Sequence, residues 1–353
     1  MYLYNRINSE ELKSKLHTEK LIRKTISFYR YFILDNQHEL RDQLYHDWLE
    51  LNCFGRIYIA REGINAQMSV PENRMEAFFQ CLKKHPVFDN IPVKYAIEDY
   101  GKSFYKLVIK VRHKLVADGL SDGAFDVTNV GRHLNALEFH DLVGSGEHIV
   151  LDMRNHYESE IGHFKGAICP EVDTFREEIT LIPEILKNEK DRKILLYCTG
   201  GIRCEKASAY LIHHGFKDVN QLHGGILEYA RKIKQLDLEP NFLGKNFVFD
   251  QRMGETINGQ VISHCHQCGK SYDVHVNCAN NLCHLLFIQC HDCAGKYENC
   301  CSKVCCDVKN GTAEDKQIFL LNIMRKFGNR QVYRKSFSLA NTSHLAAPES
   351  FSI

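Results

Sequence analysis

Apolar residues in the first third of the chain alternate between strand-like and helix-like spacing. Residues 25–32 are β-branched and aromatic, which favours a strand, and residues 38–51 repeat apolar side chains such as Leu44 and Trp48 at helical spacing. The predicted elements that follow are strands at 55–60 and 63–70, a helix at 72–84, and strands at 93–96 and 104–111. This β-α-β-β-α-β order predicts a ferredoxin-like α+β domain over residues 1–125.

The middle of the chain has a different order of predicted elements, in which short apolar strands alternate with helices. A polar segment that carries two glycines, at residues 119–123, marks the boundary before it. The predicted strands lie at 148–151, 193–197 and 219–222, and the predicted helices at 174–186, 203–214 and after 225. Such alternation predicts a parallel sheet covered on both faces, an α/β domain over residues 126–240.

The last third is irregular. An extended, glycine-punctuated connector opens residues 241–310, and the remainder of that segment is rich in cysteine. The segment 311–353 is predicted to hold one amphipathic helix, at 314–327, followed by a polar and loosely ordered tail.

Composition indicates where the protein is located but does not identify a binding partner. The chain has 353 residues, with 45 lysines and arginines against 44 acidic residues and a formal net charge of +1, so any nucleic-acid surface must be local. Charged residues appear within the first dozen positions, which leaves no room for a secretory signal, and no apolar run approaches the roughly 20 residues of a membrane span. We therefore expect a soluble, cytoplasmic protein that does not associate with membranes.

A candidate nucleophile stands at the end of the strand 193–197. Cys198 is followed by Thr199, Gly200, Gly201, Ile202, Arg203 and Cys204, a glycine loop that leads into a predicted helix. Unpaired backbone N–H groups and the positive end of the helix dipole favour a thiolate at this position, so the pKa of Cys198 should fall below the usual value of about 8.5. The two glycines allow the amides to turn inward, and Arg203 adds a positive charge near the sulfur.

These residues resemble the rhodanese, or sulfurtransferase, family. The loop is flanked in the expected order by Leu151-Asp-Met-Arg-Asn-His-Tyr-Glu158, Ile161-Gly-His-Phe-Lys-Gly-Ala-Ile168 and Leu222-His-Gly-Gly-Ile226. The resemblance covers residues 129–234 and implies that Cys198 is the nucleophile, cradled by the six-residue loop 198–203 and braced by Asp152 and Arg154. Related phosphatases have a loop one residue longer, which argues against a phosphatase.

A wider resemblance, over residues 1–306, is to the rhodanese-like tRNA uridine hydroxylases. It is carried by Cys198-Thr-Gly-Gly-Ile-Arg-Cys-Glu-Lys206, Ala60-Arg-Glu-Gly-Ile-Asn-Ala66, Gly244-Lys-Asn-Phe-Val-Phe-Asp250 and Val276-Asn-Cys-Ala-Asn280. The resemblance implies hydroxylation of the wobble uridine, position 34 of tRNA, to 5-hydroxyuridine. It also implies tRNA as partner, molecular oxygen as co-substrate and an electron donor that the sequence does not identify.

Several chemical roles fit Cys198. Addition of its thiolate to C6 of uracil would make C5 electron-rich, whereas a persulfide or a sulfenic acid on the same sulfur would be a different working species. Cys204 either resolves an oxidised Cys198 or only faces the first helical turn. At the level of the whole protein, the alternatives are a thiosulfate or persulfide sulfurtransferase and a noncatalytic binding protein built on the same scaffold, although the intact Cys198 and Arg203 disfavour the latter.

A tRNA substrate requires a surface that contacts phosphates. Alternation along the strand 104–111 and just beyond it predicts one basic face opposite an apolar one. The candidate residues are Lys102, Lys106, Lys110, Arg112 and Lys114, together with Arg61 from the first domain. An ordinary solvated basic face is the alternative.

Cysteines concentrate near the end of the chain, with ten of the fifteen between residues 265 and 306. Two Cys-x-x-Cys pairs so close together are a strong metal signal, and tetrahedral zinc suits such thiolates. The predicted ligands are Cys265, Cys268, Cys278, Cys283, Cys290, Cys293, Cys301 and Cys305, enough for two ions. A set of reduced thiols or an iron–sulfur cluster are the alternatives.

Overall fold

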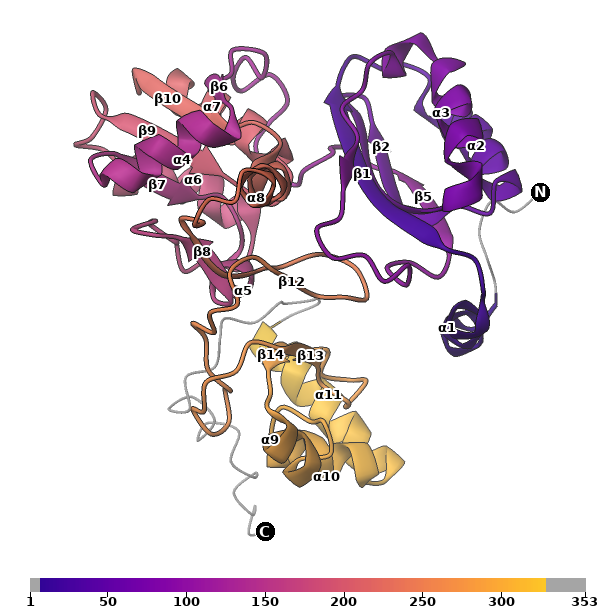
Figure 1. Ribbon diagram of the computed structural model, residues 1–353. Helices are drawn as coiled ribbons and strands as arrows, with labels where there is room; N and C mark the ends of the chain where they lie inside the picture. Colours follow the sequence, from indigo (N-terminus) through magenta and orange to yellow (C-terminus); the bar gives the residue numbers. More distant parts are fainter. Residues whose placement is uncertain (1–6, 328–353) are drawn as a thin grey trace.

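The computed structural model describes residues 7–327, and the predicted tail at 336–353 lies outside them. Three units follow one another along the chain (Figure 1). No helix in the described part of the chain is long and apolar enough to cross a bilayer.

The N-terminal unit is a five-stranded sheet in the order β4-β1-β3-β2-β5. Its strands are β1 (Arg23–Tyr31), β2 (Phe54–Ala60), β3 (Gly63–Pro71), β4 (Lys94–Tyr95) and β5 (Leu107–Val111), and its helices are α1 (Ser9–Thr18), α2 (Gln37–Glu50) and α3 (Met75–Lys83). The first four strands have the ferredoxin-like order, and β5 is added parallel to β2. The predicted ferredoxin-like class is confirmed, although β5 begins three residues later than expected.

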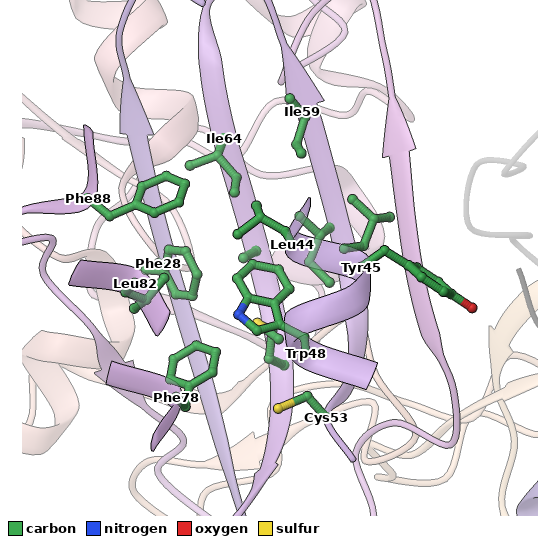
Figure 2. Packing of buried hydrophobic residues seen from close by; sticks show 14 of the residues in the cluster. Phe28, Leu44, Tyr45, Trp48, Cys53, Ile59, Ile64, Phe78, Leu82 and Phe88 are labelled. Atoms are coloured by element: carbon green, nitrogen blue, oxygen red, sulfur yellow. The ribbon is translucent and has the colours of Figure 1, made fainter. Parts of the chain in front are cut away.

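The core of this unit lies between the sheet and helices α2 and α3 (Figure 2). Trp48 from α2 packs against Phe28 of β1 and Phe78 of α3, with ring centroids 6.4 and 5.8 Å away, and the two phenylalanine rings are 6.3 Å from each other. Because side chains alternate along a strand, Ile26 and Phe28 point into this core while Tyr29 and Tyr31 point to the opposite face. Within residues 7–125, no helix covers that face, which is turned toward the central unit (Figure 1).

The central unit is a parallel sheet in the order β6-β10-β9-β7. The strands are β6 (Arg132–Leu134), β7 (Ile149–Asp152), β9 (Lys193–Tyr197) and β10 (Asp218–Leu222), and the helices are α4 (Ala136–Ser145), α5 (His156–Ser159), α6 (Phe175–Ile185), α7 (Ile202–His213) and α8 (Gly225–Gln235). One apolar cluster joins the sheet to α6 and α7, and another joins it to α4 and α8. The predicted sheet with two covered faces is therefore confirmed.

The C-terminal part first adds a strand to the central unit and then folds into a separate small unit. Strand β11 (Phe242–Asn246) pairs with β8 (Gly162–Phe164) of the central unit and with β12 (Glu255–Thr256). Beyond it come the hairpin β13 (His275–Asn277) and β14 (Leu286–Ile288) and the helices α9 (His291–Lys296), α10 (Lys303–Asn310) and α11 (Ala313–Phe327). The last of these is the helix predicted at 314–327.

Candidate active site

Cys198 is held between the end of β9 and the start of α7. Strand β9 is buried from Ile194 to Tyr197, because it lies in the middle of the parallel sheet. The loop turns at Gly201, whose φ of +99° is a conformation that glycine adopts readily. Its N–H donates to Cys198 Sγ at 3.1 Å, so the loop points a backbone donor at the sulfur, as the sequence predicts.

The surroundings of Cys198 favour the thiolate. Burial of the fully enclosed side chain opposes ionisation, but the hydrogen bond from Cys204, the charge of Arg203 and the backbone N–H groups of Cys204 and Arg203 together lower the pKa of Cys198 to about 5. Burial and the neighbouring Cys198 raise the pKa of Cys204 well above its usual range, so Cys204 keeps its proton and donates it to the shared hydrogen bond. At neutral pH, Cys198 is therefore the ionised member of a buried pair of thiols.

Arg203 is fixed by a carboxylate that the sequence analysis did not single out. Its guanidinium donates to both oxygens of Glu158, with Nη1 at 2.6 Å from Oε1 and Nη2 at 2.8 Å from Oε2. Thr199 Oγ1 reaches the same carboxylate at 3.4 Å, and Glu158 is fully buried on the short helix α5. Glu158 thus connects the first and last parts of the loop.

Asp152 and Arg154 brace the site less directly than expected. They pair with each other through two contacts of 2.7 and 2.8 Å, and Arg154 also donates to the carbonyl of Gly162. The hydroxyl of Tyr197 donates to Asp152 at 2.7 Å, which ties the ends of β7 and β9 together. The pair supports strand β9, which precedes Cys198, whereas Glu158 contacts the loop itself.

The N-terminal unit forms a second wall against the loop. Lys94 of β4 donates to the carbonyl of Gly200 at 2.6 Å, and the hydroxyl of Tyr31 reaches the carbonyl of Ile202 at 3.4 Å. Lys206 of α7 forms ion pairs with Glu62 at 2.9 Å and with Asp118 at 2.7 Å. The sequence analysis did not predict this interface. The signal that could have indicated it is the alternation along β1, which places Tyr29 and Tyr31 on the face opposite the core.

The six basic candidates for tRNA contact do not form one continuous face. Lys114 follows the end of β5 instead of lying within it, and it turns inward to Asp118 at 2.8 Å. Lys102 donates to the backbone carbonyls of Leu16 and Glu19. The single basic face predicted through residue 114 is therefore wrong, because the strand and its alternation stop at Val111.

The other four basic candidates remain nearer the surface. Lys110 and Arg112 are exposed at the end of β5, and Arg61 is exposed at the adjacent turn between β2 and β3, where it lies 3.6 Å from Asp35. Lys106 is half-buried beside the ring of Tyr105. Arg61, Lys110 and Arg112 thus occupy one end of the N-terminal sheet.

The eight predicted ligand cysteines fall into two groups of four. One group is Cys265, Cys268, Cys290 and Cys293, the other is Cys278, Cys283, Cys301 and Cys305, and within each group all Sγ atoms lie within 4.8 Å of one another. The sulfur–sulfur distance is 3.6 Å between Cys268 and Cys290 and 3.7 Å between Cys283 and Cys301. A tetrahedron with zinc–sulfur bonds of about 2.3 Å has edges of about 3.8 Å, so each group has the size of a zinc site.

Backbone donors complete these groups. The N–H of Cys290 donates to Cys265 Sγ at 3.3 Å, and that of Cys301 donates to Cys278 Sγ at 3.4 Å. Such N–H groups stabilise the anionic sulfur of a metal ligand. Both four-cysteine groups are therefore suited in distance and in chemistry to a soft divalent ion.

Family models match all three units. A model described as UPF0176 acylphosphatase like domain matches residues 23–115, a rhodanese-like domain matches 135–232, and a model described as rhodanase C-terminal matches 243–306. Among solved structures, a rhodanese-like domain from Anabaena is 22% identical, covers 32% of this chain and 78% of its own, and has a TM-score of 0.26.

Curated relatives match nearly the whole chain. A protein of Leptospira interrogans named tRNA uridine(34) hydroxylase is 56% identical over 306 residues, which are 87% of this chain and 83% of the relative. A protein of Yersinia pestis with the same name is 47% identical and covers 98% of both chains. The chain belongs to the tRNA uridine(34) hydroxylase family.

Proposed function

We propose that this protein hydroxylates uridine 34 of tRNA at C5, with Cys198 as the reactive group. The observation that carries the proposal is the buried Cys198, whose sulfur accepts the N–H of Gly201 at 3.1 Å, in a chain that matches curated hydroxylases over most of its length. A tRNA substrate also agrees with the cytoplasmic setting that we expect from the sequence.

The proposed chemistry begins with the thiolate. Addition of Cys198 Sγ to C6 of uracil places electron density on C5, which can then bond to an electrophilic oxygen species. Loss of the C5 proton and departure of the sulfur restore the ring with a hydroxyl at C5. If molecular oxygen supplies that atom, the second oxygen atom becomes water after accepting two electrons and two protons from an external donor.

Cys204 has a defined place in this scheme. Its thiol donates a hydrogen bond to Cys198, so it is positioned to stabilise the sulfur as a thiolate when that sulfur leaves C6. The same proximity would allow Cys204 to resolve a Cys198 that had been oxidised to a sulfenic acid, with formation of a disulfide and release of water.

An isotope experiment tests the proposed reaction. Cells that lack every other route to 5-hydroxyuridine are complemented with this gene and grown under ¹⁸O-labelled oxygen, and position 34 of their tRNA is analysed by mass spectrometry. The proposal expects the nucleoside to depend on the gene and to carry the label. Absence of the nucleoside, together with thiosulfate-to-cyanide sulfur transfer by the purified protein, would identify a sulfurtransferase instead.

We further propose that Arg61, Lys110 and Arg112 contact tRNA phosphates. These three side chains are exposed at one end of the N-terminal sheet, whereas Lys102 and Lys114 are engaged within the protein. Neutralised phosphates release counterions, so a local basic cluster is sufficient for binding even when the net charge is near zero.

The two four-cysteine groups are proposed to hold zinc in structural roles. Zinc bound to four thiolates has no open coordination position and no redox activity, so it would stabilise the small C-terminal unit without entering the reaction. That unit contacts the active-site side of the protein, because His266 lies 2.7 Å from Glu160 and Ile288 packs in one cluster with Tyr157 of α5.

A further inference from the structure

The face of the N-terminal sheet that lies opposite its core meets the loop of Cys198. Tyr29 and Lys94 come from the neighbouring strands β1 and β4, which pair through Ser27 and Lys94. The ammonium of Lys94 lies 4.3 Å from the centre of the Tyr29 ring. Both side chains reach across to the central unit, whose loop begins more than a hundred residues later in the sequence.

Lys94 contacts the loop directly. Its Nζ donates to the carbonyl of Gly200 at 2.6 Å and lies 4.3 Å from the centre of the Tyr29 ring. Placing an ammonium beside a carbonyl and a ring removes much of its water, and neither of these two groups carries a full charge. The negative charges that act on Lys94 are those of Cys198, Glu205 and Glu228. Burial of a charged lysine in such a position lowers the stability of the protein unless the ammonium is attracted to a nearby negative charge.

Tyr29 fixes the other side of the contact. Its hydroxyl donates to Glu205 at 3.2 Å, and Glu205 is held in turn by Gln221 at 3.1 Å and by His133 at 3.0 Å. The hydroxyl oxygen is also so close to Gly201 that a Cβ at that position would lie 2.7 Å from it. The two units are thus fitted to each other at residues 200 and 201.

We propose that Lys94 is a positioning residue for Cys198, which holds the Gly200 carbonyl and supplies a second positive charge that favours the thiolate. The active site is then made by two units, because the central unit contributes the nucleophile and the N-terminal unit contributes a charge that stabilises it. This inference rests on the proposed role of Cys198 as a reactive thiolate.

The electrostatics of Lys94 agree with this role. Burial lowers the pKa of Lys94 to about 8, against opposing contributions from Cys198, Glu205 and Glu228. Since the attraction between two opposite charges is mutual, the charged Lys94 favours ionisation of Cys198. The other titratable groups whose charges act on Cys198 or Lys94, or on Arg203 beside them, are Cys204, Glu205, Glu158, Glu178, Glu228 and Tyr29.

Alkylation of Cys198 as a function of pH measures this effect without tRNA, oxygen or an electron donor. The full-length protein is treated with iodoacetamide, and the modified peptide that contains Cys198 is quantified by mass spectrometry. The inflection of the rate with pH reports the thiolate, while enclosure of the sulfur changes only the amplitude. Lys94→Gln removes the charge but keeps a hydrogen-bond donor, Lys94→Arg keeps the charge, and Lys84→Met changes an exposed lysine of the same unit as a control.

The wild-type inflection is expected near 5, and that of K94Q is expected to be higher by about one pH unit, the lower end of the shift that a nearby opposite charge causes. K94R and K84M should follow the wild type. A K94Q profile that superimposes on the wild type overturns the inference, and so does an equal shift in K94Q and K94R. A wild-type inflection near the free value of about 8.5 would instead contradict the proposed thiolate itself.

Discussion

Arg203 and Glu158 form a two-point ion pair that is enclosed in the protein beneath the loop of Cys198. Removal of one member of a buried pair leaves the other without its partner, which costs far more than loss of an exposed pair. The pair also determines where the charge of Arg203 lies, so it couples the stability of the fold to the reactivity of the sulfur.

Substitution of Glu158 by Gln should therefore destabilise the protein by about 3 kcal/mol, the lower limit for breaking a buried pair. Urea unfolding of the purified variant measures this change. Glu189→Gln, which breaks the exposed pair with Arg192, is the matched control and should cost less than about 1 kcal/mol. Equal losses in the free energy of unfolding for the two substitutions would show that the buried pair contributes no more to stability than an exposed pair.

The two glycines of the loop should differ in their tolerance of a side chain. At Gly201 a Cβ would meet the Tyr29 hydroxyl at 2.7 Å, and the backbone has a φ of +99°, whereas a Cβ at Gly200 would meet nothing within 4 Å. Gly201→Ala is expected to lower the free energy of unfolding by about 2 kcal/mol, and Gly200→Ala to leave it nearly unchanged. A Gly200→Ala variant as unstable as Gly201→Ala would contradict the loop geometry.

Metal content tests the C-terminal unit. Protein purified without chelators should contain two zinc ions per chain by elemental analysis, and Cys268→Ser and Cys283→Ser should each remove one, because these residues belong to different groups. Cys81→Ser, a half-buried cysteine of α3, serves as the control and should retain both ions. Iron with visible absorption would replace the zinc interpretation by a cluster.

The exposed basic residues are expected to determine both the affinity for tRNA and its dependence on salt concentration. The double substitution Lys110→Ala and Arg112→Ala should weaken binding and reduce the slope of log affinity against log salt by about one for each residue. Lys217→Ala, at an exposed ion pair on the central unit, should leave both quantities unchanged. Unaltered salt dependence in the double variant would exclude this end of the sheet as a phosphate contact.

Local patterns predicted the elements that depend on local causes. Apolar periodicity identified both sheets, because each strand and helix has its own buried face. The order of strand, cysteine, two glycines and arginine placed the loop at the N-terminus of α7. The eight cysteines were identified by their spacing. Their division into two groups depends on the hairpin β13–β14, which connects the pair Cys265 and Cys268 to the pair Cys290 and Cys293.

Contacts between distant segments could not be predicted in the same way. Glu158 meets Arg203 across 45 residues, and Lys94 meets Gly200 across 106, so no spacing in the sequence connects them. Lys114 was misplaced for a different reason: the alternation of β5 was extended beyond Val111, where the chain leaves the sheet and an acidic partner, Asp118, becomes available.

The most direct test of Cys198 is the amount of 5-hydroxyuridine at position 34 of tRNA in cells that lack other routes to it and produce either the wild-type protein or Cys198→Ser at equal abundance. Serine at this position keeps the shape of the side chain but does not ionise near neutral pH. We expect the modified nucleoside with the wild-type protein and with Cys81→Ser, and none with Cys198→Ser. Full hydroxylation by the Cys198→Ser protein would contradict the central role of this sulfur.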